Sequence, residues 1–232
     1  MLQQRRADQR GHTQTGWLDS RHSFSFGSYR DPRHMGFGKL RVINDDIIDP
    51  GAGFGEHPHR DMEIITYVVE GALQHADSLG TGSVIHPGEV QIMSAGTGIR
   101  HSEFNASDKE RCRFLQIWIP PNQIGLPPRY EQKRFPIADE TGKLHRMLDP
   151  DGKDGALVIH QDARLYAGRF HHGEQTSLEI EPGRRSWVQV VKGHLEVNGE
   201  PLGRGDGLGL VDVTTLRIDN CDGAEILVFD LA

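Results

Sequence analysis

The chain has 232 residues, of which 36% are apolar and 25% are charged, and its formal net charge is −7. This size and composition are typical of a soluble globular protein with one large domain or two modest ones. The negative charge excludes the broad cationic surface that binding to a phosphate backbone requires, so no nucleic-acid partner is expected.

The sequence carries no pattern for export or for crossing a membrane. It opens with the polar segment Met1-Leu2-Gln3-Gln4-Arg5-Arg6 in place of a secretory signal. Its longest apolar runs, such as Ile64-Ile65-Thr66-Tyr67-Val68-Val69, have the length of a strand. Cys112 and Cys221 are the only cysteines, which is too few for a disulfide framework, and Cys112 has the apolar neighbours of a core residue. We expect a cytoplasmic monomer with no membrane partner.

Short segments with strand character recur along the chain between turn residues, which include 28 glycines and 12 prolines. Regular short strands with almost no helical periodicity indicate a sandwich or barrel, so the predicted fold class is all-β, with helix confined to turns or the connection. The predicted strands are Leu40–Ile43, Glu63–Val69, Ala72–Ala76, Glu89–Met93, Phe114–Ile119, Ser177–Ile180, Trp187–Val191, His194–Val197, Leu208–Val211, Thr215–Ile218 and Glu225–Leu231.

Two short motifs in the first half each place potential metal ligands two residues apart. They are His57-Pro58-His59 and His101-Ser102-Glu103, and glycines cluster before each. On an extended strand, residues i and i+2 share a face, with Cα atoms roughly 6.5 to 7 Å apart. One such pair alone would fit a surface or core role. Two pairs on strands that line one cavity would give three imidazoles and one carboxylate, a set that suits a divalent first-row metal.

An internal repeat indicates two related β-barrels in tandem. Val68-Val69-Glu70-Gly71-Ala72-Leu73 is echoed by Val190-Val191-Lys192-Gly193-His194-Leu195, and a Gly-acid pair follows each segment. The predicted domains are residues 1–125, which would bind the metal, and 126–232, a diverged copy without metal. The 122-residue offset places Glu179 and Glu181 where His57 and His59 stand, and the second half has no His-x-His.

The remaining histidines lack a donor partner at i+2 or point to opposite faces, with two exceptions. His22, in Ser20-Arg21-His22-Ser23-Phe24, and His75, two residues before Asp77, are candidates for a role beside the ligands. Surface or turn roles are expected for His12, His34, His86, His145, His160, His171, His172 and His194.

Residues 10 to 120 resemble the pirin family of bicupins. The resemblance rests on segments 16–26, 40–46, 57–63 and 93–103, which include Gly16-Trp17-Leu18-Asp19-Ser20-Arg21-His22, Leu40-Arg41-Val42-Ile43-Asn44-Asp45-Asp46 and Gly98-Ile99-Arg100-His101-Ser102-Glu103. It implies a bicupin of two antiparallel jelly-roll barrels with the metal ligands His57, His59, His101 and Glu103. Many other cupins keep a ligating glutamate at the place of Glu63, which makes Glu63 the alternative carboxylate.

The resemblance also implies an activity, because pirin-like proteins include bacterial quercetinases. We therefore expect a metal-dependent dioxygenase (quercetin 2,3-dioxygenase) that opens the central ring of flavonols with O2, with a small aromatic substrate, O2 and Glu103 as the catalytic general base. The expected cofactor is one divalent transition metal, Fe(II) in the first place, with Cu, Mn, Co, Ni or Zn as alternatives. The second hypothesis is a metal- or redox-sensing interaction module that acts as a regulatory cofactor, since the same fold and ligands would serve either role.

Overall fold

The computed structural model describes residues 2–232, so Met1, where the predicted first domain begins, lies outside the described residues. Apart from two short 3-10 helices, η1 (Ala7–Gln9) and η2 (Lys153–Gly155), its regular elements are strands, which confirms the all-β prediction. In chain order the strands are β1 (Leu2–Arg5), β2 (Gly11–Gln14), β3 (Leu18–His22), β4 (Val42–Ile48), β5 (Gly53–His59), β6 (Glu63–Glu70), β7 (Leu73–Asp77), β8 (Gly82–Ile85), β9 (Glu89–Ser94), β10 (Ile99–Asn105), β11 (Cys112–Ile119), β12 (Arg129–Arg134), β13 (His145–Asp149), β14 (Leu157–Val158), β15 (Ala163–Phe170), β16 (Thr176–Glu179), β17 (Arg185–Val197), β18 (Glu200–Gly203), β19 (Gly207–Val211) and β20 (Thr215–Leu231).

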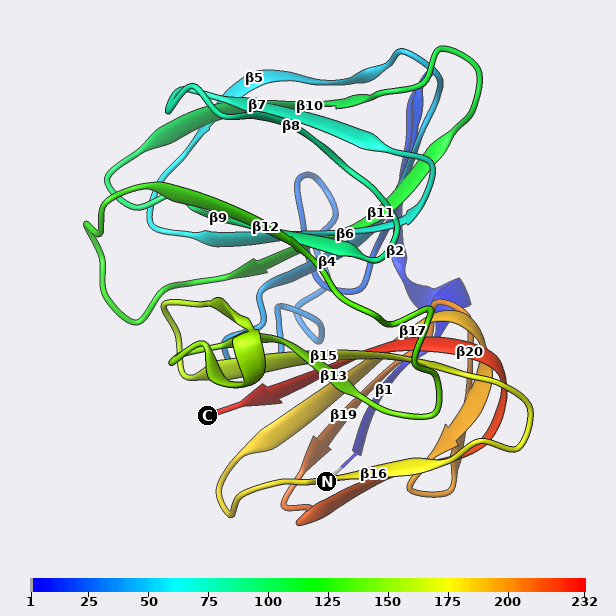
Figure 1. Cartoon of the computed structure of the whole chain (residues 1–232). Coiled ribbons are helices and arrows are strands. Elements are labelled where there is room, and N and C mark those ends of the chain that lie inside the picture. The colour runs from blue at the N-terminus through cyan, green and yellow to red at the C-terminus, as the bar shows by residue number, and fades with distance from the viewer. Residues whose placement is uncertain (1) are drawn as a thin grey trace.

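The first half of the chain folds into two facing sheets. One has the order β12-β9-β6-β11-β4-β3-β2 and the other β5-β10-β7-β8, and Figure 1 shows the smaller sheet above the larger one. Both are antiparallel. The sheets are open rather than closed into full barrels, yet the arrangement is the cupin jelly roll that was expected.

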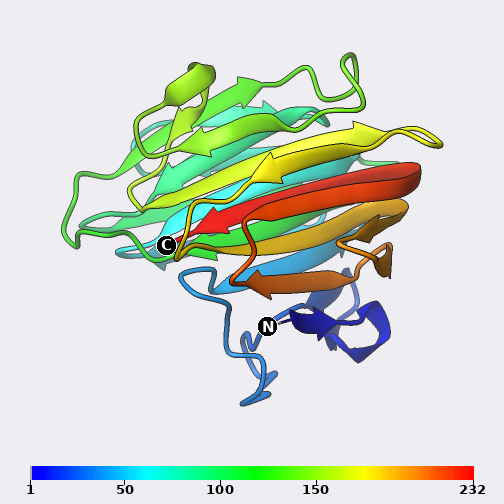
Figure 2. The same ribbon diagram turned by 90° about the horizontal axis from the view of Figure 1, so that it is seen from below.

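The second half is built around one nine-stranded sheet. Seven strands follow the path β1-β19-β17-β20-β15-β13-β14, while β16 pairs with β20 and β18 pairs with β17. Figure 2 shows β20, in red, between β15 and β17, so the C-terminal segment Ile226–Leu231 lies inside the sheet as predicted. The sequence suggested two strands each for residues 187–197 and 215–231. In the structure β17 and β20 are each one long strand. β17 is irregular where its register on β20 shifts and at Gly193, which has a φ of 67°.

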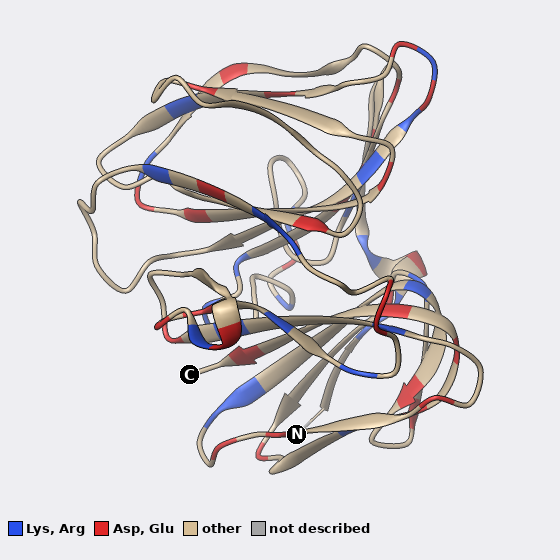
Figure 3. Cartoon of the chain, in the orientation of Figure 1, with Lys and Arg blue, Asp and Glu red and all other residues tan. Residues whose placement is uncertain are grey.

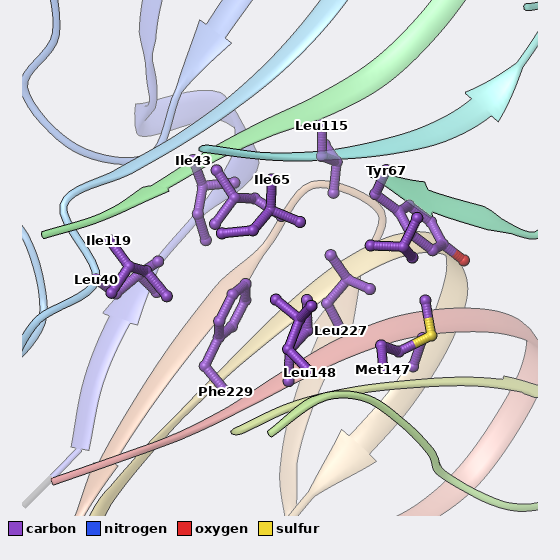
Figure 4. Close-up of a cluster of buried hydrophobic side chains, with 14 of the residues drawn as sticks. Leu40, Ile43, Ile65, Tyr67, Leu115, Ile119, Met147, Leu148, Leu227 and Phe229 are labelled. Atoms are coloured by element: carbon purple, nitrogen blue, oxygen red, sulfur yellow. The ribbon is translucent and has the colours of Figure 1, made fainter. Parts of the chain in front are cut away.

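The largest apolar cluster lies between the two halves. Figure 4 shows Ile43, Ile65 and Leu115 of the first half packed toward Leu227 and Phe229 of the second, and all five are buried. Complete burial of each such side chain contributes about 1.5–3 kcal/mol. Because side chains alternate along a strand, this packing turns the even-numbered residues of β4, β6 and β11 into the first half's interior.

Polar contacts and one strand that pairs with the other half's sheet also join the halves. The Tyr67 hydroxyl donates to Glu225 at 2.6 Å, and Arg113 donates to the Val191 carbonyl at 3.1 Å. The first strand, β1, pairs with β19, so the chain starts in the sheet of the second half. β12 pairs with β9 and thus lies in the first half's sheet. The division at residues 125 and 126 stays a prediction.

The charged residues are dispersed. Figure 3 shows basic and acidic positions interspersed along both halves, with no element given over to one sign. No helix among residues 2–232 is long and apolar enough to span a membrane.

Candidate metal centre

Three of the predicted ligands meet on neighbouring strands of the smaller sheet. His57 and His59 lie on β5, and His101 lies opposite His57 on β10. The ring centroids are 4.8 Å apart for His57 and His59, 4.5 Å for His57 and His101, and 4.9 Å for His59 and His101. One ring nitrogen of each lies within 4.8 Å of the other two. These three side chains therefore converge as their spacing predicted, and their role as metal ligands stays a prediction.

The close approach of β5 to β10 depends on a glycine. A Cβ atom at Gly53 would lie 2.2 Å from the Glu103 carbonyl oxygen and 2.5 Å from the Phe104 Cα. Backbone atoms cannot yield as a side chain can, so a larger residue would push the strands apart. The glycine that precedes His57-Pro58-His59 thus keeps the two ligand-bearing strands together.

Glu103 lies beside the histidines and is held by the opposite sheet. The Gln116 Nε2 amide on β11 donates to both carboxylate oxygens, at 3.0 and 2.8 Å, and the Thr66 hydroxyl lies 3.4 Å from one of them. A carboxylate oxygen of Glu103 and a ring nitrogen each of His75 and His101 lie within 4.8 Å of one another. His101 therefore belongs to both groups and links the carboxylate to the three-histidine cluster.

The electrostatics favour neutral imidazoles. Burial, with the neighbouring His57, His59 and His75, lowers the pKa of His101 to about 2, and burial with His57 lowers the pKa of His59 to about 4. Both His101 ring nitrogens are buried and have no hydrogen-bond partner among residues 2–232. Since metal ligation needs the neutral ring, the donors present fit a divalent metal.

Glu103 has the opposite shift. Burial raises its pKa above the ordinary carboxyl value, although the hydrogen bond from Gln116 acts in the other direction. A carboxylate with a raised pKa binds a proton more readily, so this side chain is suited to accept one.

His75 and Asp77 form a buried pair behind the cluster. The His75 Nε2 lies 3.0 Å from an Asp77 carboxylate oxygen, and both side chains are inaccessible to solvent. The His75 ring stacks on Tyr130 with centroids 4.7 Å apart. His75, which the sequence offered as a residue beside the ligands, thus lies next to His101 and Glu103.

A cavity of about 510 Å³ opens beside the predicted ligands. His57, His59 and Glu103 form part of its wall, and Trp17, Phe26, Phe54 and Trp118 supply aromatic surface. Trp118 packs edge-on against His59 at 5.0 Å. The polar side chains that complete the wall are Thr13, Ser20, His22, Ser28, Asn44, Asp46 and Gln116. The volume and the mixed lining are those of a small-molecule site.

Glu63, the alternative carboxylate, lies elsewhere. Its carboxylate accepts from the Ser94 hydroxyl at 3.0 Å and from the His160 backbone at 3.2 Å. Its odd number, like those of His57 and His59, does not bring Glu63 to the same cavity. β5 ends at His59, and β6 begins at Glu63 in a different sheet after a turn with Asp61 at a φ of 48°. The odd-numbered residues of β6, including Ile65, face the second half.

Sequence reasoning missed the residues that the larger sheet contributes. Thr66, Asn44 and Gln116 lie opposite one another in register on β6, β4 and β11, with Asp46 two residues beyond Asn44. The available signal was period-two alternation: polar Asn44 and Asp46 interrupt an apolar strand, and Gln116 stands between Phe114 and Trp118. That pattern does not determine which face of each strand lies toward the histidines.

Comparison with known proteins identifies relatives along the whole chain. The Pirin family pattern matches residues 3–119, and the pattern of the quercetinase C-terminal cupin domain matches residues 147–231. The chain is 50% identical to quercetin 2,3-dioxygenase of Escherichia coli strain K12, over 100% of this chain and 99% of the relative.

Two solved structures show the same fold. The crystal structure of YhhW from Escherichia coli, 50% identical, covers 100% of this chain and 98% of its own with a TM-score of 0.96. That of bacterial pirin YhhW in complex with nickel(II), also 50% identical, covers 100% and 99% with a TM-score of 0.95.

Proposed function

This chain belongs to the pirin family, and we propose that it is a metal-dependent dioxygenase that opens the central ring of flavonols such as quercetin with O2. The observation that carries the proposal is the placement of His57, His59 and Glu103 in the wall of a cavity with aromatic lining, with His101 clustered with the two histidines. A relative that is 50% identical and is named quercetin 2,3-dioxygenase supports it. Ring opening would consume one O2 and release carbon monoxide.

We assign the metal to His57, His59, His101 and Glu103. The low pKa values of His59 and His101 and the unpartnered nitrogens of His101 favour this assignment. The nickel(II) complex of the bacterial pirin supports a divalent metal, and we propose Fe(II) for this chain in the cell. A divalent metal bound there supplies a Lewis acid that lowers the pKa of a coordinated hydroxyl group.

Glu103 is proposed as the general base for the 3-hydroxyl of the flavonol. Its raised pKa matches the requirement that the base bind the proton it removes. The two hydrogen bonds from Gln116 hold the carboxylate in one orientation, and the Thr66 hydroxyl contacts both Glu103 and Gln116. Gln116 is accordingly a positioning residue.

The aromatic wall would bind the planar rings and exclude water. Trp17 and Phe54 pack edge-to-face with centroids 5.1 Å apart, and Phe26 and Trp118 do the same at 5.3 Å. Such flat apolar surfaces suit a polyphenol, and removal of bulk water strengthens the electrostatic contacts of the bound substrate.

The test combines metal analysis with oxygen exclusion. Protein of measured metal content is mixed with quercetin without oxygen, its absorption spectrum is recorded, and oxygen is then admitted. We expect a spectral shift on binding, followed by oxygen-dependent loss of quercetin and release of carbon monoxide. Binding without turnover for Fe, Mn, Co, Ni and Cu in turn would reject the dioxygenase and favour the metal- or redox-sensing interaction module.

A further inference from the structure

Asp46 is the aspartate of the cavity wall, and the metal centre does not use it. It lies on β4, opposite Ser20 of β3 and Phe114 of β11, and only 3% of its surface is exposed. The Oδ1 atom is buried and has no hydrogen-bond partner among residues 2–232. A buried carboxyl oxygen without a partner is unfavourable, and more so if it is charged.

The polar neighbours of Asp46 are occupied with one another. The His22 ring lies 2.8 Å from the Asn44 side-chain oxygen through Nδ1 and 2.9 Å from the Thr13 hydroxyl through Nε2. His22 and Asn44 therefore have structural partners for these atoms. Among the carboxylates of the cavity wall, Asp46 has a buried oxygen without a hydrogen-bond partner in the described part of the chain, as Trp118 has a buried ring nitrogen without one.

The adjacent Asp45 shows what a structural aspartate looks like in this strand. It points to the opposite face, where Arg113 donates to both carboxylate oxygens at 2.8 and 3.0 Å and Arg10 lies at 3.4 Å. Burial raises the pKa of Asp45, but these arginines outweigh burial and bring it below the ordinary value. Asp46 has no such cation. Burial raises its pKa to about 7, the hydrogen bond from the Ser20 hydroxyl opposes the rise, and Asp45 and Glu103 add to it.

The surroundings of Asp46 indicate the ligand. The cavity that it lines has the aromatic side chains Trp17, Phe54 and Trp118 as well as Glu103. A ligand that fills it must be largely flat and apolar, and a hydrogen-bonding group that meets Asp46 would satisfy the buried oxygen. A ring hydroxyl of a polyphenol meets both requirements.

We propose that Asp46 is a specificity-determining residue that hydrogen-bonds a phenolic hydroxyl of the bound ligand, so that the site selects polyhydroxylated aromatic compounds over their unsubstituted counterparts. The inference rests on the proposed function in taking this cavity as the substrate site. It adds that one ring hydroxyl is recognised by a protein side chain and not by the metal. Sites that hydrogen-bond a hydroxyl group discriminate strongly against analogues that lack it, because their own polar group is left unpaired.

The test compares two ligands without oxygen. Quercetin and 3-hydroxyflavone share the 3-hydroxyl and the carbonyl, but only quercetin has hydroxyls on the outer rings. Dissociation constants are measured by quenching of tryptophan fluorescence in zinc-loaded wild type, Asp46→Ala, Asp46→Leu and, as a matched control, Asp151→Asn, which changes an exposed aspartate of the second half. Metal content and thermal midpoint are recorded for each variant.

We expect wild type and Asp151→Asn to bind quercetin about tenfold or more tighter than 3-hydroxyflavone, as one hydrogen bond to a buried carboxyl group allows. Both Asp46 variants should lose most of this ratio through weaker quercetin binding, with 3-hydroxyflavone little affected. An unchanged ratio in either folded, metal-loaded variant would overturn the inference, as would equal binding of both ligands by wild type. Because binding needs no turnover, discrimination between the two ligands would leave the inference standing even if the separate oxygen assay, run with Fe, Mn, Co, Ni and Cu in turn, rejected the dioxygenase.

Discussion

The side-chain amide of Gln116 donates to both carboxylate oxygens of Glu103, at 3.0 and 2.8 Å, across the interior of the first half. The two residues lie on different sheets, Gln116 on β11 and Glu103 on β10. The contact therefore orients the predicted carboxylate ligand from the wall opposite its own strand.

Replacement of Gln116 by Leu should weaken metal binding about 10- to 100-fold, the usual effect of removing a group that orients a ligand. The measurement is a competition titration with a chelator of known affinity. Gln123→Leu, at an exposed position, is the control. Equal affinity for the Gln116 variant and wild type would show that the hydrogen bonds do not position Glu103 for the metal.

Replacement of His57 or His59 by Ala removes a predicted ligand rather than its support. The loss of affinity should exceed the 100-fold or so that marks the upper range for orienting groups. His171→Ala and His172→Ala, at exposed positions of the second half, should bind metal like wild type. The assignment fails if His57→Ala and His59→Ala bind as tightly as these controls.

One metal ion per chain is expected. Both clusters of potential ligands found among residues 2–232 lie in the first half, and they share His101. Elemental analysis after removal of loosely bound ions should give a metal-to-protein ratio near one. Two equivalents of tightly bound metal would contradict the prediction that the second half has no site.

Glu103→Gln separates the two proposed roles of this residue. The amide keeps the size and an oxygen donor, so some metal should be retained. It cannot accept the substrate proton. With metal occupancy matched to wild type, oxygen-dependent quercetin loss should fall by about 10²- to 10⁴-fold, the typical contribution of general base catalysis. An undiminished rate at matched occupancy would show that Glu103 is not the base.

Asp46→Asn should change how stability depends on pH. Because the folded-state pKa is about 7 and the ordinary value is 3.8, the folded protein binds more protons than the unfolded chain between these values. The contribution of Asp46 to stability is therefore present at low pH and is lost as pH rises toward 7. One pKa unit corresponds to about 1.4 kcal/mol, so the loss amounts to a few kcal/mol.

Urea unfolding of the metal-free protein at pH 5 and pH 8 measures this effect. The fall in unfolding free energy between the two pH values should be larger for wild type than for Asp46→Asn. The same fall in both proteins would mean that Asp46 titrates near its ordinary value.

Local sequence was sufficient for part of the strands and for the faces of the predicted donors, whereas β1–β3, β8, β12–β15 and β18 were not predicted. Alternation along a strand depends only on backbone geometry, so His57 with His59, and His101 with Glu103, could be assigned to common faces from their spacing. Glycine positions, among them Gly53, also marked where strands approach closely. The resemblance to pirins added the bicupin fold, which the structure confirms.

Tertiary structure decided which face of each strand meets the site. Glu63 has the parity of His57, but its strand belongs to the other sheet, and that sheet's odd-numbered residues pack against the second half. The same packing turns Asn44, Asp46 and Gln116 toward the cavity. The two faces of a strand are equivalent until another sheet covers one of them, so the sequence determined the histidine cluster while only the packing of the halves determined the wall that faces it.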